Sequence, residues 1–180
     1  APMPATDPLQ RHPWFAATAS PRVLAHRGLI SADSPDVVEN SFLAVAAAHA
    51  AGATYVESDC HLTRDGVVVL FHDDTLERVT GDPRRVADVT VGELDAIMSD
   101  RGGLLTLPHA LDAFPTLRFN LDVKAAGAAE PVGRAVARHT ARVLLTSFSD
   151  SRRIAAVRAA MDAGATLRPA ISAGTAVISR

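Results

Sequence analysis

The chain has 180 residues, of which 48% are hydrophobic, and its 18 basic and 20 acidic residues leave a formal net charge of −2. This length suits one domain with a single core, and the even mixture of charges excludes the basic stripe of a nucleic-acid or membrane-surface binding protein. The single cysteine, Cys60, excludes an intrachain disulfide bond and a multi-cysteine metal site, which favours a cytoplasmic location.

The first 21 residues are predicted to form an N-terminal arm. Prolines are frequent in this stretch, and it holds no apolar run long enough for a signal peptide or a transmembrane helix. Trp14 and Phe15 are expected to pack the arm against the rest of the chain. Residues 22–180 are predicted to form the single domain that follows the arm.

Six short apolar runs, rich in β-branched residues, are predicted to be strands. They are Arg22–Gly28, Thr54–Leu62, Val67–His72, Leu117–Lys124, Arg142–Ser149 and Thr166–Ser172. Alanine-rich helical stretches lie between them, and this alternation is typical of βαβ units that build a parallel sheet.

Three helices are located by the signals at their ends. Residues 41–51 have apolar side chains at helical spacing, and Gly52 follows where a left-handed cap is expected. Thr90 begins a second helix with the spacing of a capping box, and Asp150 is predicted to cap a third. Residues 75–85 are predicted to be a loop that covers a site as a lid.

Charged and imidazole side chains gather at the ends of the predicted strands. His26 and Arg27 close the first strand. In the second strand, Glu57 and Asp59 are two residues apart and therefore project from the same face. His61 also lies on that face, where a structural role is the simpler expectation for it.

The next two strands extend this set. His72 follows the third strand, and Asp122 and Lys124 share one face of the fourth strand with Asn120. Because parallel α/β barrels build their sites at the carboxyl ends of the strands, a single site explains all these side chains together.

The two neighbouring carboxylates of the second strand call for a positive charge nearby. Like charges this close raise each other's proton affinity, and a divalent cation compensates them most simply. Oxygen ligands favour Mg²⁺ or Ca²⁺ over zinc. Salt bridges to neighbouring arginines are the alternative for a Glu-x-Asp pair.

Several short motifs follow one another in order between residues 23 and 148. They are His26-Arg27-Gly28, Glu39-Asn40-Ser41, Gly52-Ala53 with Glu57 and Asp59, Thr63-Arg64-Asp65-Gly66, His72-Asp73, Asp122 with Lys124, and Ser147-Phe148. This ordered set resembles the glycerophosphodiester phosphodiesterase family, one of the phosphatidylinositol-phospholipase-C-like TIM barrels. The resemblance implies a TIM (β/α)8-type barrel that hydrolyses glycerophosphodiesters to glycerol 3-phosphate and an alcohol, in glycerol and lipid metabolism.

The resemblance implies a metal site. Glu57, Asp59 and Asp122 match the family's ligands for a divalent metal, Mg²⁺ or Ca²⁺, and Asn40 matches a supporting amide. Asp122 stands where many members have a glutamate. Aspartate offers the same oxygens from a shorter stem, so the strand or the metal would need to lie closer.

The resemblance also implies the acid, the base and the phosphate-binding groups. His26 and His72 match the family's general acid and base pair. Arg27 and Lys124 match its phosphate-binding cations. The sequence leaves open whether water or the substrate's own glycerol hydroxyl attacks phosphorus.

Two alternatives to this function stay open. One is a lipid phosphodiesterase of the lysophospholipase D or sphingomyelinase D type, which shares the layout of histidines and carboxylates. The other is a catalytically silent barrel that serves as a binding module. The presence of both histidines and all three carboxylates argues against a silent barrel.

The number of strands falls short of a closed barrel. A TIM-type barrel has eight strands and typically ~250 residues, whereas six strands are predicted here and residues 175–180 resemble the start of the next helix. We therefore expect a barrel truncated after about six strands. It would be a fragment of a longer polypeptide, or self-association with a second copy would cover its open edges.

Overall fold

The computed structural model describes residues 12–16 and 24–172. Its strands are β1 (Leu24–His26), β2 (Tyr55–Leu62), β3 (Val68–Leu70), β4 (Arg118–Val123), β5 (Val143–Thr146) and β6 (Ala170–Ile171). Five of them form a parallel sheet in the order β1-β2-β4-β5-β6, and β3 pairs with β2 alone. Every strand falls inside a predicted run, so the expectation of an α/β fold with a parallel sheet is confirmed.

The helices lie between these strands along the chain. They are α1 (Phe42–Ala50), α2 (Glu77–Thr80), α3 (Val91–Met98), α4 (Leu107–Ala113), α5 (Ala129–Val136) and α6 (Asp150–Asp162), with 3₁₀ turns η2 (Val86–Asp88), η3 (Ala126–Ala128) and η4 (Thr140–Arg142). As predicted, the Thr90 hydroxyl accepts a hydrogen bond from the Glu93 amide and caps α3. The prediction that Asp150 caps α6 was wrong by one residue, because the Ser149 hydroxyl accepts from the Arg152 amide.

The direction of β3 corrects the sequence interpretation. The prediction treated it as a further strand of the parallel barrel, but β3 runs antiparallel to β2, with Cys60 opposite Leu70. The connection between them is too short for the crossover that a parallel pair requires. Instead, the Thr63 and Val67 backbones close a tight turn, in which Gly66 has a φ of 84°.

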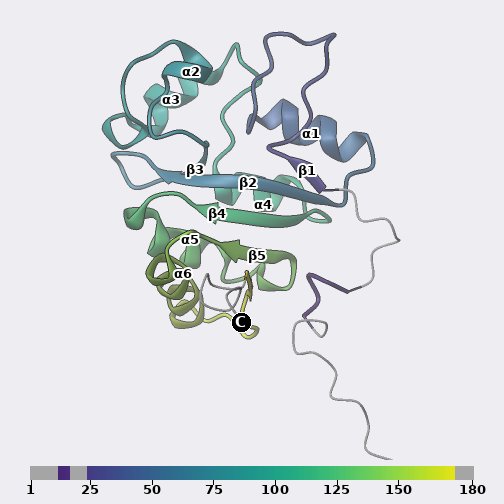
Figure 1. The fold of residues 1–180 in the computed structure, drawn as a ribbon, viewed down its shortest axis with the longest axis vertical. Coiled ribbons are helices and arrows are strands. Elements are labelled where there is room, and N and C mark those ends of the chain that lie inside the picture. The colour runs from purple at the N-terminus through teal and green to yellow at the C-terminus, as the bar shows by residue number, and fades with distance from the viewer. Residues whose placement is uncertain (1–11, 17–23, 173–180) are drawn as a thin grey trace, which may run out of the picture.

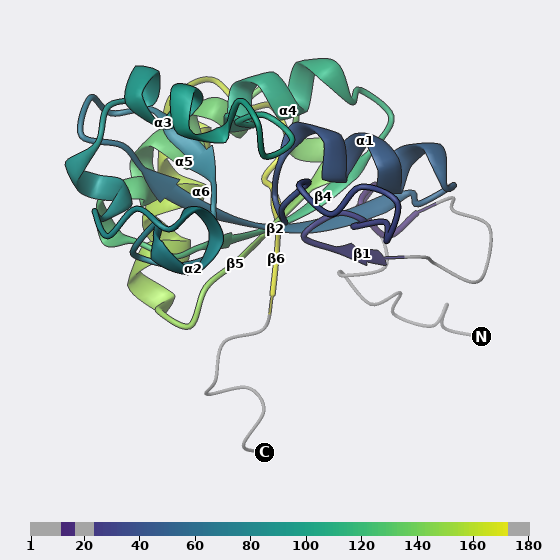
Figure 2. The ribbon, with the colours of Figure 1, turned by 90° about the horizontal axis from the view of Figure 1, so that it is seen from above.

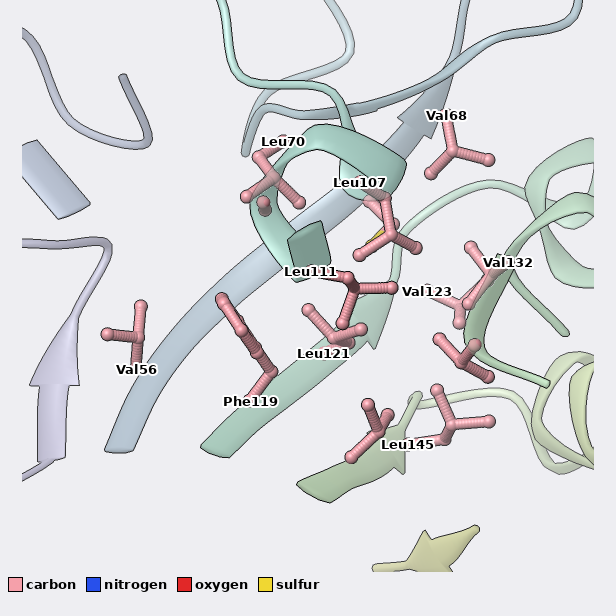
Figure 3. Packing of buried hydrophobic residues seen from close by; sticks show 14 of the residues in the cluster. Val56, Val68, Leu70, Leu107, Leu111, Phe119, Leu121, Val123, Val132 and Leu145 are labelled. Carbon is pink, nitrogen blue, oxygen red and sulfur yellow. The ribbon is translucent and has the colours of Figure 1, made fainter. Parts of the chain in front are cut away.

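Most of the helices cover one face of the sheet. Figure 2 shows α1, α4, α5 and α6 on the same side of the strands. In the core between the layers, Leu107 and Leu111 of α4 lie over Phe119 and Leu121 of β4 (Figure 3). The alternate residues of each strand therefore face away from this core, as the period of two requires.

A smaller aromatic cluster packs on the opposite face. Trp14 contacts Tyr55, Leu144 and Ala170, with Phe15 at its edge. The Trp14 indole donates a hydrogen bond of 2.9 Å to the Phe119 carbonyl, and the Tyr55 hydroxyl donates one of 2.6 Å to the Trp14 carbonyl. The expectation that Trp14 and Phe15 pack the arm against the sheet is confirmed.

The predicted lid is a folded excursion rather than a plain loop. It contains α2, and backbone hydrogen bonds join Leu76 to Arg84 and Asp74 to Val86 across its base. Leu76 is fully buried in a second core, which also contains residues of α3. Figure 1 shows α2 and α3 grouped beside β3, apart from α1. Buried apolar contacts therefore hold this segment in place.

The edges of the sheet are open within residues 24–172. There, β1 pairs only with β2, and β6 pairs only with β5. The expectation that further chain or a second copy covers these edges stays a prediction. The proposed helix start at residues 175–180 lies outside the described residues, as does most of the arm. Among the helices that the structure describes, none is long and apolar enough to cross a membrane.

Candidate active site

The turn after β1 holds two residues in an unusual backbone conformation. Arg27 has a φ of 58° and Asn40 a φ of 60°, in the left-handed region that non-glycine residues seldom adopt. The Asn40 amide donates a hydrogen bond of 2.9 Å to the Arg27 carbonyl, so each residue helps to hold the other. Strain of this kind gathers at functional sites, where the surroundings enforce it.

The carboxylates lie on neighbouring strands, because β3 leaves the parallel order and β2 pairs directly with β4. Asp59 of β2 stands directly opposite Asp122 of β4, and Glu57 stands opposite Asn120. Asp59 is almost fully buried, with 1% of its surface exposed. Since paired strands place opposite residues within about 5 Å, these side chains converge on one patch at the carboxyl end of the sheet.

Asp59 is compensated by three neighbours. Arg27 Nε lies 3.5 Å from Asp59 Oδ2, and Lys124 Nζ lies 3.8 Å from Asp59 Oδ1. Asn40 Nδ2 donates to Asp59 Oδ2 at 3.3 Å, while Asn40 Oδ1 accepts from the Ser58 hydroxyl. Two cations and an amide therefore surround this carboxylate, and their contacts offset the cost of burying it.

Lys124 also forms a close ion pair with the carboxylate that was predicted as the third metal ligand. Its Nζ lies 2.9 Å from Asp122 Oδ2. Burial alone would lower the pKa of Lys124, but the hydrogen bond to Asp122 and the surrounding carboxylates outweigh it and raise that pKa. Lys124 is therefore firmly protonated and neutralises part of the acidic patch.

Glu57 is the least compensated carboxylate of the patch. Its Oε2 lies 3.3 Å from His26 Nε2, yet this buried oxygen accepts no hydrogen bond. Burial, followed by the charge of Asp59, raises the pKa of Glu57 to about 7. On the opposite strand, the buried Asn120 Oδ1 also has no hydrogen-bond partner. Two buried oxygen acceptors therefore lack a hydrogen-bond partner here.

The donor set fits a hard divalent cation. The available donors are oxygens from neighbouring strands, and both orphaned acceptors are oxygens, which Mg²⁺ and Ca²⁺ prefer. Nevertheless, in residues 12–16 and 24–172 no three acidic, histidine or cysteine side chains lie close enough together to hold a metal ion. Instead, Lys124 forms an ion pair with Asp122, and Arg27 forms one with Asp59.

The antiparallel strand β3 returns His72 to the same end of the sheet. The Phe71 amide donates to the Asp59 carbonyl at 2.9 Å, which places His72 beside the carboxylates of β2. His72 Nδ1 lies 2.7 Å from Asp73 Oδ1. A carboxylate only accepts hydrogen bonds, so Nδ1 carries the proton and Nε2 is left for a proton-transfer partner.

Sequence reasoning assigned no role to three residues that connect this site. Arg78 forms ion pairs with both Asp73 and Glu39, and Glu39 in turn pairs with Arg27. Asp73 and Arg78 lie five residues apart without a regular helical or strand spacing, and Glu39 lies 39 positions before Arg78, so no regular spacing marks the three as partners. Glu39 and Asp73 belong to the motifs that resemble the family, and this was the one sign in the sequence that they could belong to the site.

His61 has the structural position expected of it. It is buried, and its Nε2 donates a hydrogen bond of 3.0 Å to the His72 carbonyl. Burial lowers its pKa. His61 therefore supports the backbone of His72 as a neutral imidazole.

Ion pairs, hydrogen bonds and strand pairing thus connect all the residues predicted for the site, although their chemical roles stay predictions. Residues 26–150, which include all of them, match the model of the Glycerophosphoryl diester phosphodiesterase family. The chain belongs to this family, as the sequence motifs indicated.

Two curated relatives illustrate the match. The "Probable glycerophosphodiester phosphodiesterase 2" of Mycobacterium tuberculosis is 39% identical over 162 residues, which cover 86% of this chain and 57% of that protein. A lysophospholipase D of Homo sapiens is 29% identical over 115 residues, which cover 56% of this chain and 35% of that protein. The chain therefore spans little more than half of the first relative and about a third of the second.

Solved structures show the same fold. The glycerophosphodiester phosphodiesterase of Thermotoga maritima has a TM-score of 0.61 and 31% identity, over 73% of this chain and 55% of that chain. A phosphodiesterase of Oleispira antarctica, in complex with the product sn-glycerol-3-phosphate, has a TM-score of 0.59 and 25% identity, over 84% of this chain and 64% of that chain. The predicted TIM-barrel class is confirmed over part of its length.

Proposed function

We propose that this chain carries the active site of a metal-dependent hydrolase that cleaves glycerophosphodiesters to glycerol 3-phosphate and an alcohol. The observation that carries the proposal is the connected set of two histidines, three carboxylates and two cations at one end of the sheet. Membership of the family supports it. So does the glycerol 3-phosphate product bound to the related phosphodiesterase of Oleispira antarctica.

Arg27 and Lys124 are the groups that bind phosphate. Each lies against a different carboxylate oxygen of Asp59, and each side chain is only 22% exposed, so their charges are poorly hydrated. A phosphodiester anion between them gains charge-assisted hydrogen bonds from a planar guanidinium and from an ammonium. These contacts orient phosphorus above the carboxylate patch.

The two histidines move the protons. Nδ1 of His72 carries a proton and donates it in a hydrogen bond to Asp73, which leaves Nε2 available to the reacting group. His26 has a side chain that is 67% exposed, and its Nε2 lies beside Glu57. One of them takes a proton from the nucleophile, and the other gives a proton to the departing alcohol.

Glu57, Asp59 and Asp122 would hold the divalent metal, Mg²⁺ or Ca²⁺, with Asn40 supporting Asp59 through its amide. When bound, such a cation neutralises negative charge that develops on the phosphoryl oxygens. Two features of Glu57 support this assignment. Its Oε2 accepts no hydrogen bond, and burial together with the charge of Asp59 raises its pKa, an effect that a bound cation would oppose.

The test of the reaction measures release of glycerol 3-phosphate from glycerophosphocholine after chelation, and then after Mg²⁺ or Ca²⁺ is added back. His26→Ala and His72→Ala should each lower kcat by roughly 10²- to 10⁴-fold. His109→Ala is the matched control, because His109 is an exposed residue of α4 that stacks on Phe42. Full turnover in either of the first two variants would refute the acid and base assignment.

Metal binding is tested separately by calorimetric titration with Mg²⁺ or Ca²⁺. Glu57→Gln and Asp59→Asn should abolish the binding heat and leave the circular dichroism spectrum unchanged, because each removes one of two crowded carboxylates. Asp95→Asn, at an exposed position of α3, should bind like the wild type. Unchanged binding in Glu57→Gln and Asp59→Asn would end the metal assignment.

A lysophospholipase D activity is the second candidate. It is favoured by the human relative of that name and by Phe148, an aromatic residue that is 92% exposed and lies with its ring 5.9 Å from Lys124 Nζ. Choline release from lysophosphatidylcholine, in the absence of activity on glycerophosphocholine, would favour this candidate. Metal binding without turnover of either substrate would instead favour a silent binding module.

A further inference from the structure

Arg78 of α2 lies at the junction of two ion-pair chains. Its Nε donates to Asp73 Oδ2 at 2.8 Å, and one Nη donates to Asp73 Oδ1 at 3.0 Å. Its other Nη donates to Glu39 Oε1 at 2.8 Å. The guanidinium therefore makes a bidentate contact with Asp73 and donates to Glu39 with its remaining nitrogen. Among the side chains, only arginine provides this geometry.

The first chain leads to the proton-transfer histidine. The same Asp73 oxygen that accepts from Arg78 at 3.0 Å also lies 2.7 Å from His72 Nδ1. Hydrogen bonds from Arg78, the largest influence, hold the pKa of Asp73 well below its usual range. An ionised, immobile carboxylate keeps the proton on Nδ1, so Arg78 fixes the tautomer of His72 through Asp73.

The second chain leads to the phosphate-binding arginine. Glu39 Oε2 accepts from Arg27 Nη1 at 3.0 Å, and Arg27 Nε approaches Asp59 at 3.5 Å. Burial alone would raise the pKa of Glu39, but the hydrogen bonds and charges of Arg78 and Arg27 outweigh it and lower that pKa. Glu39 thus stays charged and holds the Arg27 fork in a fixed orientation.

The segment that carries Arg78 is itself fixed. Leu76, two residues earlier, is fully buried, and the Arg84 carbonyl accepts from its amide at 2.9 Å. The carbonyl of Leu76 in turn accepts from the Thr80 hydroxyl at 2.8 Å. An isolated surface ion pair contributes little, whereas a bidentate pair on an anchored backbone can orient its partners.

We propose that Arg78 is a positioning residue that sets both His72 and Arg27 for phosphodiester hydrolysis. This inference rests on the proposed function, because it assigns Arg78 a task in that reaction. Through Asp73 it holds the histidine in the tautomer that leaves Nε2 available. Through Glu39 it holds the guanidinium that receives the phosphate.

The kinetic test separates the two chains. Asp73→Asn should lower kcat roughly 10- to 100-fold with little change in KM, because it acts on the histidine alone. Glu39→Gln should chiefly raise KM, because it releases Arg27. Arg78→Ala should both lower kcat and raise KM. Adding Asp73→Asn to Arg78→Ala should lower kcat no further. Arg78→Lys should recover only part of the activity lost in Arg78→Ala, since one ammonium cannot contact both carboxylates.

The matched control is Arg85→Ala. Arg85 lies in the same segment, its side chain is 60% exposed, and its ion pair is with Asp88, away from the site. Its removal should leave kcat and KM unchanged. Equal kinetics in Arg78→Ala and Arg85→Ala would overturn the inference.

A second measurement needs no turnover. Nitrogen NMR of the metal-free protein, at a pH about two units above the usual histidine pKa, reports which ring nitrogen of His72 is protonated. The wild type and Arg85→Ala should show protonated Nδ1, and Arg78→Ala should show a mixture of tautomers. An unchanged tautomer in Arg78→Ala would overturn the histidine half of the inference. Absence of hydrolysis by the wild type would overturn the proposed function, and the tautomer alone would then decide whether Arg78 positions His72.

Discussion

Replacing Gly28 by alanine should damage the turn that presents His26 and Arg27. Gly28 has a φ of 89°, and a Cβ added there would lie 2.7 Å from the carbonyl carbon of Ala44 and 2.8 Å from its oxygen. Those atoms belong to the backbone of α1, which cannot move aside as the end of a side chain could. The turn and α1 would have to separate.

The magnitude follows from two costs. An alanine in the left-handed region costs about 1–2 kcal/mol, and overpacking against backbone adds about 1–3 kcal/mol. The sum is about 2–5 kcal/mol, which lowers Tm by roughly 4–20 °C in a chain of this length. Gly66→Ala is the control, because Gly66 has a φ of 84° but nothing within 4 Å of the added Cβ.

Thermal unfolding followed by circular dichroism measures both variants under the same conditions. Gly66→Ala should show only the backbone cost, a loss of roughly 2–8 °C. The Tm of Gly28→Ala should be clearly lower than that of Gly66→Ala. If the two variants melt together, the turn is not held against α1, and the reasoning about close packing at Ala44 is wrong.

Three further outcomes can be measured. Trp14→Ala should lower the free energy of unfolding by about 3–5 kcal/mol, as measured with urea. The substitution empties a packed site and removes the hydrogen bond from the indole to the Phe119 carbonyl. A loss below about 1 kcal/mol would show that the aromatic cluster contributes little. Arg78→Gln removes the hydrogen bonds that depress the pKa of Asp73. That stabilisation exists above the unfolded pKa of about 3.9 and disappears as pH falls through the lower folded pKa, so the wild-type advantage in Tm should shrink from about pH 5 to pH 2, and a constant difference would contradict it. Phe148→Ala should raise KM for choline-bearing substrates two- to fivefold, as expected for an exposed cation–π contact of about 0.5–1 kcal/mol, with no change in metal affinity; an unchanged KM would remove Phe148 from the substrate site.

The strands and the faces of their side chains could be predicted because burial imposes a simple period. Val56 and Cys60 pack in the core, while Glu57 and Asp59 point the other way, as alternation requires. The direction of β3 was missed, although the short connection around Gly66 was the signal for it. Apolar runs locate strands, and the length of the connection decides how they pair.

The site was predictable up to the point where its contacts depend on tertiary structure. His26 and Asp122 stand at or beside the carboxyl ends of β1 and β4, and parallel pairing brings Asp122 opposite Asp59 of β2. Arg78 reaches the site from a helical turn whose position depends on a second core, and no repeat in the sequence reports that. The segment predicted to be a lid carries Arg78, and the burial of Leu76 holds that segment in place.

The packing of residues 12–16 also constrains the order in which the chain folds. His12 Nε2 donates to the Arg168 carbonyl across 156 positions of sequence, and Trp14 bonds Phe119 across 105. Neither partner exists as a docking surface until β4 has joined the sheet and the chain around Arg168 has arrived. Residues 12–16 are therefore expected to dock last. Contacts of such long range are slow to form, so Trp14 fluorescence should report the final phase of folding.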